Sequence, residues 1–143
     1  MRYLLVLSLF ALASCSATRQ TGKSADTAAK ASLKGTVWTL SRIPGTEMEK
    51  TRKPVTILLS DTSARYGGYG GCNGYGGDYV LNGDSLKLGE VLATMMACKP
   101  GSHTENNFFK ALRETNMYQI SGDKLLLKNG NTTLAELTRS KKD

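Results

Sequence analysis

The sequence predicts an α+β domain: a small, antiparallel, β-rich fold, either barrel-like or a curved sheet, with one packed α-helix. Short runs in which β-branched or aromatic residues alternate with polar residues indicate strands. Asn-Gly pairs between such runs are typical of tight hairpins. One stretch between two hairpins carries apolar residues at helical spacing. The chain has 143 residues, which is enough for one domain of this kind with a tail at either end.

Residues 1–14 have the features of a lipoprotein signal peptide. Met1-Arg2 is a short basic start, and Tyr3–Leu12 is an apolar run that is too short to span a bilayer as a permanent helix. The following Leu12-Ala13-Ser14-Cys15 resembles the lipobox of bacterial lipoproteins, in which cleavage precedes the cysteine and the new terminal cysteine is acylated. We therefore expect palmitate on Cys15. The alternative is an ordinary signal peptide with an incidental cysteine.

Residues 15–32 are expected to form the lipidated cysteine and a flexible tether. Ser16–Ser32 contains no aromatic or long aliphatic residue, so it cannot bury enough apolar surface to fold. Ser16 follows the cysteine, and no acidic residue does. By resemblance to lipoprotein sorting rules, this favours the outer membrane, with the protein facing the periplasm.

The domain itself is predicted at residues 33–138 and opens with two strands. Leu33–Leu40 alternates in the strand period, and its Trp38 is expected in the core rather than stacked on a ligand. Pro44-Gly45 marks a turn, and the charged Thr46–Lys53 is expected to be a loop. Val55–Leu59 forms the second predicted strand, with alternate residues on one face.

Gly67–Tyr79 is a glycine-rich stretch that predicts a sharp β corner. Seven of its thirteen residues are glycine, and tyrosines interleave with them. Glycine in a strand pattern marks a bend or a close approach of another backbone. We expect two short strands that meet at Cys72-Asn73-Gly74. Gly71 and Gly74 should tolerate alanine poorly if they have positive φ angles. The stretch lacks the signatures of a nucleotide phosphate loop.

Three hairpins are predicted after the corner. Asp78–Leu81 and Ser85–Leu88 flank Asn82-Gly83, and the same pattern returns once, which suggests a pseudo-repeated hairpin. The two copies are Tyr79–Leu88 and Tyr118–Leu127. A last hairpin joins Lys124–Lys128 to Thr132–Leu137 through Asn129-Gly130.

The apolar run Val91–Ala97 and one helix are expected between the two copies. The run should lie in the core or beside it. Ser102-x-x-Glu105 resembles a capping box, so the helix should begin there and end near Asn116. Phe108 and Leu112 lie at helical spacing, and we expect their face to cover the sheet.

The cysteines predict a disulfide. If Cys15 carries lipid, Cys72 and Cys98 remain in a compartment outside the reducing cytosol, where a disulfide is the default. The alternative is a metal site formed by these two residues and His103. Zinc sites usually have paired ligands at short spacing, which this chain lacks. We therefore expect no metal and no cofactor.

The net charge of +7 does not predict nucleic-acid binding, because the excess lies at the termini. Residues 33–138 carry twelve basic and ten acidic residues. The remaining cations lie close to the lipid site or in residues 139–143, which are expected to form a solvated basic tail near an anionic membrane.

Several motifs resemble the META domain family of HslJ-like, heat-inducible bacterial lipoproteins. The resemblance covers about Leu33 to Leu137, and the motif residues of the corner and of the following segment are Gly71, Asn73, Gly74, Thr94 and Met95. The matching stretches are Leu33-x-Gly35-Thr36-x-Trp38-x-Leu40, Gly70-Gly71-Cys72-Asn73-Gly74-Tyr75-Gly76-Gly77-x-Tyr79, Ala93-Thr94-Met95-Met96-Ala97-Cys98 and Glu105-x-x-Phe108-x-x-x-Leu112. The resemblance implies a small antiparallel fold with one helix. It also implies an envelope protein linked to heat stress and novobiocin tolerance, without an accepted catalytic activity.

The sequence does not predict an enzyme. Ser102 and His103 are adjacent, and no nucleophile elbow is present, so the remaining candidate pair is Asp78 and Asp84. We expect a monomeric, membrane-tethered envelope module that acts in stress or antibiotic tolerance by binding a protein, a polymer or a small apolar molecule.

The alternative function is an inhibitor of a secreted hydrolase. Such an inhibitor should expose anchor residues near Tyr66–Tyr75, whereas a binder of small apolar molecules should have a cavity behind Trp38 and Phe108.

Overall fold

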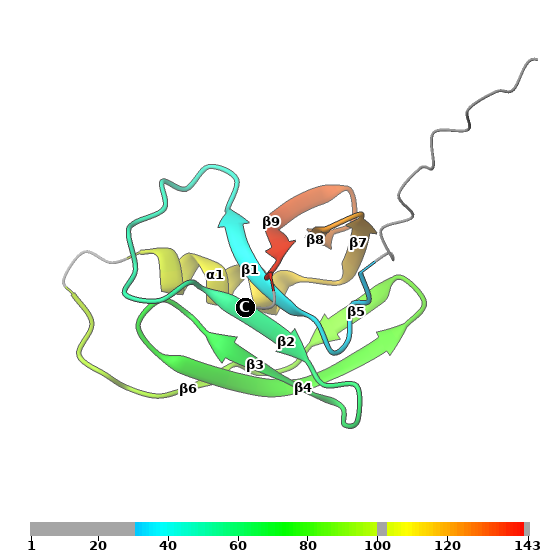
Figure 1. Cartoon of the computed structure of the whole chain (residues 1–143), viewed down its shortest axis with the longest axis horizontal. Helices are drawn as coiled ribbons and strands as arrows, with labels where there is room; N and C mark the ends of the chain where they lie inside the picture. Colours follow the sequence, from blue (N-terminus) through cyan, green and yellow to red (C-terminus); the bar gives the residue numbers. More distant parts are fainter. Residues whose placement is uncertain (1–30, 100–102, 142–143) are drawn as a thin grey trace, which may run out of the picture.

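The computed structural model describes residues 31–99 and 103–141, and it shows a closed antiparallel barrel with one helix (Figure 1). The signal peptide, Cys15 and the tether up to residue 30 lie outside the described residues. In the described part the elements are β1 (Val37–Arg42), β2 (Thr56–Leu59), β3 (Arg65–Tyr69), β4 (Gly74–Asn82), β5 (Ser85–Leu88), β6 (Leu92–Ala93), α1 (Thr104–Glu114), β7 (Met117–Ser121), β8 (Lys124–Asn129) and β9 (Thr132–Arg139).

The barrel closes because β3 and β4 pair with each other at the two ends of the strand order. Going round the sheet, the order is β3-β2-β1-β9-β8-β7-β5-β4, and the β3–β4 pairing joins the last strand to the first. The short β6 pairs with the beginning of β4, at Tyr75 and Gly76. This arrangement confirms the predicted barrel-like α+β fold.

Alternate residues of the strands point into the barrel and form its core. This alternation follows from the strand period of two, so the side chains with β-branched, leucine or aromatic character share the inner face. The buried strand residues are Trp38, Leu40, Ile57, Leu59, Tyr66, Tyr75, Tyr79, Leu86, Leu88, Leu125, Leu127, Ala135 and Leu137. Trp38 lies in the core as predicted, and its indole Nε1 donates a hydrogen bond to the Leu33 carbonyl at 3.2 Å.

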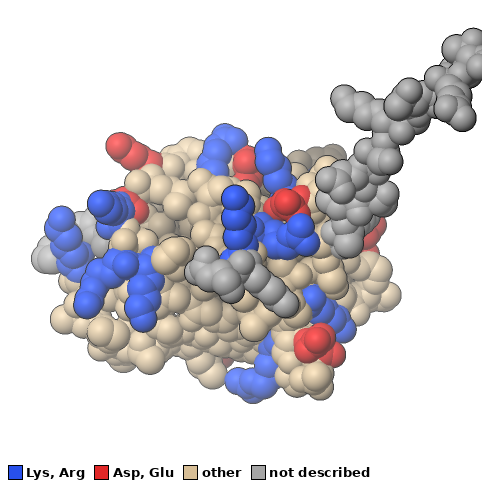
Figure 2. Space-filling model, in the orientation of Figure 1, with Lys and Arg blue, Asp and Glu red and all other residues tan. Residues whose placement is uncertain are grey.

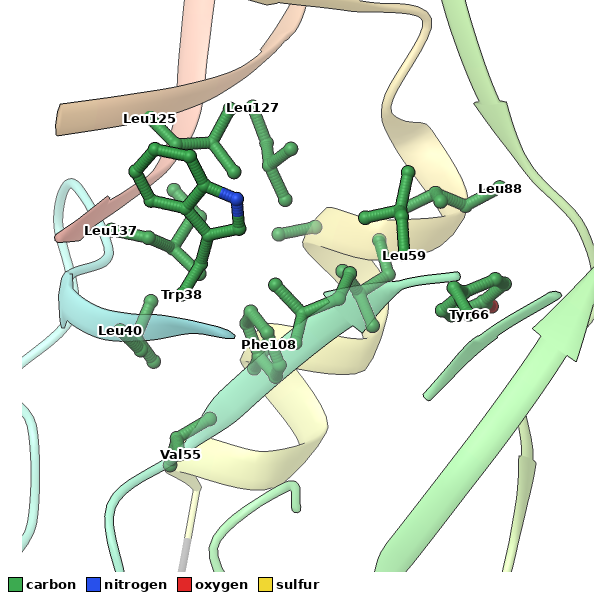
Figure 3. Packing of buried hydrophobic residues seen from close by; sticks show 14 of the residues in the cluster. Trp38, Leu40, Val55, Leu59, Tyr66, Leu88, Phe108, Leu125, Leu127 and Leu137 are labelled. Atoms are coloured by element: carbon green, nitrogen blue, oxygen red, sulfur yellow. The ribbon is translucent and has the colours of Figure 1, made fainter. Parts of the chain in front are cut away.

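Helix α1 packs its apolar face onto this core (Figure 3). Phe108 and Leu112 are fully buried, which confirms the predicted orientation of the helix. The chain leaves the helix at Thr115, which is extended and whose hydroxyl donates to the Ala111 carbonyl at 2.7 Å. With eleven residues, α1 is too short to cross a bilayer, and no helix in the described residues is long and apolar enough to do so.

The two predicted copies of the repeated hairpin are neighbours in the barrel. They form β4–β5 and β7–β8, and glycines with positive φ angles, Gly83 and Gly122, lie in their turns. The copies meet where β5 pairs with β7 through Ser85 and Met117. The pseudo-repeat therefore forms one continuous part of the wall.

The structure corrects three predicted boundaries. The first strand begins at Val37 rather than Leu33, because Gly35 has a φ angle of 69° and breaks the run. Ala31, predicted to belong to the tether, is buried in the core. Arg139 and Ser140, predicted to belong to a free tail, bond to the barrel: Arg139 lies in β9, and the Ser140 N–H donates to the Val37 carbonyl at 2.9 Å.

The run Val91–Ala97 lies beside the core, which is one of its two predicted placements, and Val91 packs against the core. Leu92, Met95 and Met96 are 65%, 99% and 58% exposed, so the run does not enter the core. The β4–β6 pairing and polar contacts to the β3–β4 turn hold it at the rim of the barrel, where Leu92, Met95 and Met96 stay exposed.

Candidate binding site around the disulfide

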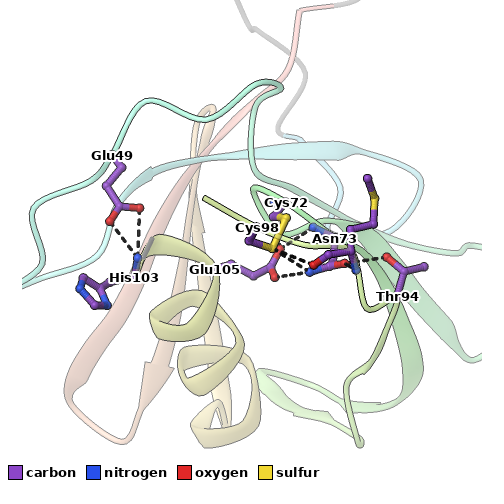
Figure 4. Close-up of a disulfide and its surroundings, with 8 residues drawn as sticks. Glu49, Cys72, Asn73, Thr94, Cys98, His103 and Glu105 are labelled. Atoms are coloured by element: carbon purple, nitrogen blue, oxygen red, sulfur yellow. Dashed lines mark hydrogen bonds between the residues drawn. A yellow bond between two sulfur atoms is a disulfide. The ribbon is translucent and has the colours of Figure 1, made fainter. Parts of the chain in front are cut away.

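A disulfide joins the β3–β4 turn to the segment that follows β6 (Figure 4). The Cα atoms of Cys72 and Cys98 are 5.8 Å apart, within the range that a disulfide can bridge. The bond confirms the predicted pairing. The alternative metal site with His103 is not formed, since both cysteines are in the disulfide and no group of three possible ligands occurs in the described residues.

Asn73 lies beside the disulfide and connects three segments. It is 6% exposed. Its Oδ1 accepts hydrogen bonds from the Thr94 hydroxyl at 2.9 Å and from the Met96 N–H at 2.8 Å, and its Nδ2 donates to Glu105 at 2.7 Å. Because Asn73 is buried, its side-chain amide depends on protein partners rather than on water for its hydrogen bonds. These partners therefore fix the orientation of the amide. Two of the predicted motif residues, Asn73 and Thr94, are thus in direct contact.

Glu105 closes this network from helix α1. Its carboxylate is 8% exposed and also accepts hydrogen bonds from the N–H groups of Cys72 at 2.9 Å and of Asn73 at 2.6 Å. Hydrogen bonds from backbone N–H groups compensate the cost of burying a carboxylate. Glu105 therefore binds the turn. Ser102, the other residue of the predicted capping box, lies outside the described residues.

Glu49 takes the capping role, and the sequence did not predict it. Its carboxylate accepts hydrogen bonds from the His103 N–H, at 2.8 and 3.1 Å to its two oxygens, and from the Thr104 N–H at 3.4 Å. A negative charge at a helix N-terminus stabilises the helix. Glu49 lies in the predicted loop between β1 and β2, far from the helix in sequence, so no local pattern could identify it.

Different structural features explain why glycine occupies each position of the corner. Gly71 has a φ angle of 122°, whereas Gly74 does not have a positive φ angle, so the condition for poor tolerance of alanine is met only at Gly71. A Cβ atom at Gly74 would meet only the Gly68 carbonyl oxygen, at 3.9 Å. A Cβ atom at Gly70 would lie 2.7 Å from the Phe109 ring and 2.8 Å from the Glu105 carboxylate. Close approach to α1 therefore explains Gly70.

Two of the tyrosines on either side of the corner, Tyr66 and Tyr75, are buried rather than displayed. Tyr66 donates to the Gly89 carbonyl at 3.0 Å, and Tyr75 donates to the Thr56 carbonyl at 2.7 Å. Burial raises the pKa of the Tyr66 phenol to about 12, and burial raises the pKa of Tyr75 further. Both rings thus belong to the core, and neither can anchor a partner.

The carboxylates of Asp78 and Asp84 do not form a catalytic pair. Asp78 lies in β4 and forms an ion pair with Arg65 at 3.2 Å, whereas Asp84 lies in the turn after β4. The four strand residues Tyr79–Asn82, which span about 13 Å, and Gly83 of the turn lie between them.

A cleft of about 420 Å³ opens next to the disulfide. Its walls come from the β1–β2 loop, the β3–β4 turn and the segment after β6, and they include Lys50, Arg52, Tyr69, Met96 and Lys99. Figure 2 shows basic side chains gathered at the end of the molecule where these loops lie. Met95, the last of the predicted motif residues, projects into solvent beside this cleft, next in sequence to the lining residue Met96.

Comparison with known proteins gives one family and two related structures. The family model of the META domain matches residues 31–142. An NMR structure of a protein from Burkholderia xenovorans shares 28% identity with a TM-score of 0.56, and the alignment covers 77% of this chain and 85% of that chain. A second NMR structure shares 19% identity with a TM-score of 0.55, over 71% and 86% of the two chains, and supports the fold alone. A search of curated proteins gave no match.

Proposed function

Because the chain belongs to the META domain family, we propose that it is a non-catalytic, membrane-anchored module of the bacterial envelope that acts in stress or antibiotic tolerance by binding a protein partner. The proposed binding surface is the rim segment, residues 92–96, which begins in β6, pairs with the glycine-rich β4 and leads to Cys98 of the disulfide. We further propose that Cys15 carries the lipid anchor and that the domain faces the periplasm from the outer membrane.

The exposure of Leu92, Met95 and Met96 is the observation that carries this proposal. Large apolar side chains gathered on a surface mark sites of interaction. Methionine side chains are flexible and polarisable, so they adapt to the shape of a partner. The backbone beneath them is fixed by the disulfide and by Asn73, which lowers the entropy cost of binding.

The alternatives receive less support from the geometry. Trp38 and Phe108 are fully buried, and neither lines the cleft beside the disulfide. Tyr66 and Tyr75 are buried, so of the tyrosines in Tyr66–Tyr75 only Tyr69, which lines the cleft, is accessible as the kind of anchor that we expected of a hydrolase inhibitor.

The position of the rim segment is consistent with an N-terminal anchor. Ala31 lies at the end of the barrel that holds the β4–β5 turn, whereas the disulfide lies at the other end of β4 (Figure 1). In a protein anchored through residues N-terminal to Ala31, the rim segment can point away from the membrane.

Site-specific photocrosslinking in intact cells tests the binding surface. A photoreactive residue at Met95 should give an adduct with another protein, whereas the same residue at Gln119, which is exposed on β7, should not. Equal adducts from both positions, or none from positions 92, 95 and 96, would contradict the proposed surface.

Palmitate labelling tests the anchor separately. The wild-type protein should be labelled and should fractionate with membranes, and Cys15→Ala should remove both properties. An unlabelled wild-type protein would contradict the lipid anchor without affecting the binding surface.

A further inference from the structure

We infer that the cleft beside the disulfide binds a phosphate monoester, that is, a dianionic phosphoryl group on a small apolar or aromatic body. The inference does not rest on the proposed protein partner, since the charged groups of the cleft are separate from Leu92 and Met95. It rests on the charge, the lining and the size of the cleft.

The cleft carries an excess of positive charge. Lys50, Arg52 and Lys99 line it, and none of them forms an ion pair with another residue in the ranges 31–99 and 103–141. Other basic residues of the barrel, such as Arg42 and Arg65, do form ion pairs. The positive potential of these three side chains is therefore available to a ligand.

The acidic residue of the lining does not cancel this potential at the mouth of the cleft. Glu49 directs its carboxylate to the N-terminus of α1, where it accepts hydrogen bonds from the His103 and Thr104 N–H groups (Figure 4). Its charge is thus compensated by the helix. A dianion near three cations gains about twice the Coulomb energy of a monoanion, which favours a phosphate monoester over a carboxylate. The guanidinium of Arg52 also matches the bidentate geometry of phosphate oxygens.

The remaining lining is suited to an apolar body. Tyr69, Met96, Ala97 and the disulfide contribute aromatic, thioether and aliphatic surface. Lys53 lies 6.0 Å from the centre of the Tyr69 ring, which adds a fourth cation close to this part of the cleft. A ligand that joins a phosphate to an apolar group can use both kinds of surface, whereas inorganic phosphate uses only the cations.

The size of the cleft limits the ligand to a small molecule or to the end of a larger one. A volume of about 420 Å³ lies at the lower end of the range for small-molecule sites. Phenyl phosphate and the head of phosphatidic acid both fit this description, and they represent a soluble source and a lipid source of the same chemistry.

Isothermal titration calorimetry on the purified full-length protein in a non-ionic detergent, without phosphate in the buffer, tests the inference. Phenyl phosphate should bind, phenol should not, and inorganic phosphate should bind about tenfold more weakly because it lacks the apolar group. Dihexanoyl phosphatidic acid supplies the lipid arm. Tighter binding of this probe than of phenyl phosphate assigns the site to a lipid head, and the reverse order assigns it to a soluble ester.

Charge-neutralising variants test whether phenyl phosphate binds in this cleft. Lys50→Gln, Arg52→Gln and Lys99→Gln should each raise the Kd of phenyl phosphate about fivefold, and the triple variant should raise it at least thirtyfold. Lys87→Gln, an exposed cation on β5, is the matched control and should leave the Kd unchanged. All four positions are at the surface, and thermal unfolding verifies that each variant is folded. No heat with phenyl phosphate up to 10 mM, or an unchanged Kd in the folded triple variant, would overturn the inference.

Discussion

The carboxylate of Glu105 on α1 holds Asn73 of the β3–β4 turn by two hydrogen bonds, at 2.6 Å from its N–H and 2.7 Å from its Nδ2. A third, from the Cys72 N–H, extends the contact to the disulfide. Asn73 in turn holds the rim segment through Thr94 and Met96. One buried ion therefore positions the helix, the turn and the segment that we propose as a binding surface.

Glu105→Gln should lower the free energy of unfolding by about 2–4 kcal/mol, because the glutamine NH₂ would face donors that need an acceptor. Glu114→Gln is the control, since Glu114 is exposed on the same helix and should change stability by less than about 0.5 kcal/mol. Urea unfolding followed by the fluorescence of Trp38, the only tryptophan, measures both. Similar values for the two variants would contradict the role of Glu105.

Replacing Cys72 and Cys98 together by Ala should cost about 2–5 kcal/mol while leaving the protein folded near room temperature. The fold should survive because the Asn73 hydrogen bonds and the barrel pairing do not depend on the sulfur atoms. Urea unfolding of the double variant against the wild type measures the difference. A thiol titration of natively exported protein that finds both cysteines reactive would show that the bond does not form in the cell.

Gly71→Ala should be more destabilising than Gly74→Ala. At Gly71 the φ angle of 122° strains any residue with a Cβ atom, and that atom would lie 3.1 Å from Thr51 Cγ2. We expect a loss of more than about 1 kcal/mol at Gly71 and less than that at Gly74. Thermal unfolding of both variants provides the comparison, and the opposite order would contradict the backbone conformation of the turn.

The sequence predicts the strands well because the residue patterns that encode them lie within short stretches of the chain. Alternation identifies β2, and the Asn-Gly turns identify the β4–β5 and β8–β9 hairpins. It does not predict the role of Glu49 or the exposure of Met95 and Met96, since both depend on contacts between distant segments. An apolar run normally predicts burial, but here polar contacts through Asn73 hold the backbone at the rim. The departure of Met95 and Met96 from the burial rule is what identifies a candidate surface.

Removing Arg139–Asp143 should lower Tm by more than about 4 °C, whereas removing Lys141–Asp143 should leave it unchanged. The longer deletion loses the Arg139 hydrogen bond to the Asp123 carbonyl at 2.8 Å, the Arg139–Asp123 ion pair at 2.7 Å and the Ser140 hydrogen bond to Val37. The shorter deletion keeps all three. Equal Tm values for the two truncated proteins would show that these contacts contribute nothing to stability.

The stability of the barrel should fall as the pH rises from about 10 to about 12, because buried tyrosines must stay protonated. An unfolded tyrosine has a pKa of about 10, whereas burial raises the pKa of Tyr66 to about 12 in the folded protein. The folded state therefore retains this proton at a pH where the unfolded state loses it. The contribution is complete below pH 10 and is lost as the pH passes through the folded pKa.

Tyr66→Phe separates this effect from other alkaline changes. The variant loses the hydrogen bond to Gly89, which should cost about 1 kcal/mol at pH 8. Between pH 10 and 12, however, its stability should fall less steeply than that of the wild type. The variant lacks the Tyr66 phenol, so its folded and unfolded states differ by one bound proton fewer than those of the wild type. Urea unfolding at pH 8, 10, 11 and 12 measures the slopes, and absorbance at 295 nm follows tyrosine ionisation. If folded wild-type protein ionises all its tyrosines with the same midpoint as the urea-unfolded chain, Tyr66 and Tyr75 are accessible to hydroxide and the described packing of the corner is wrong.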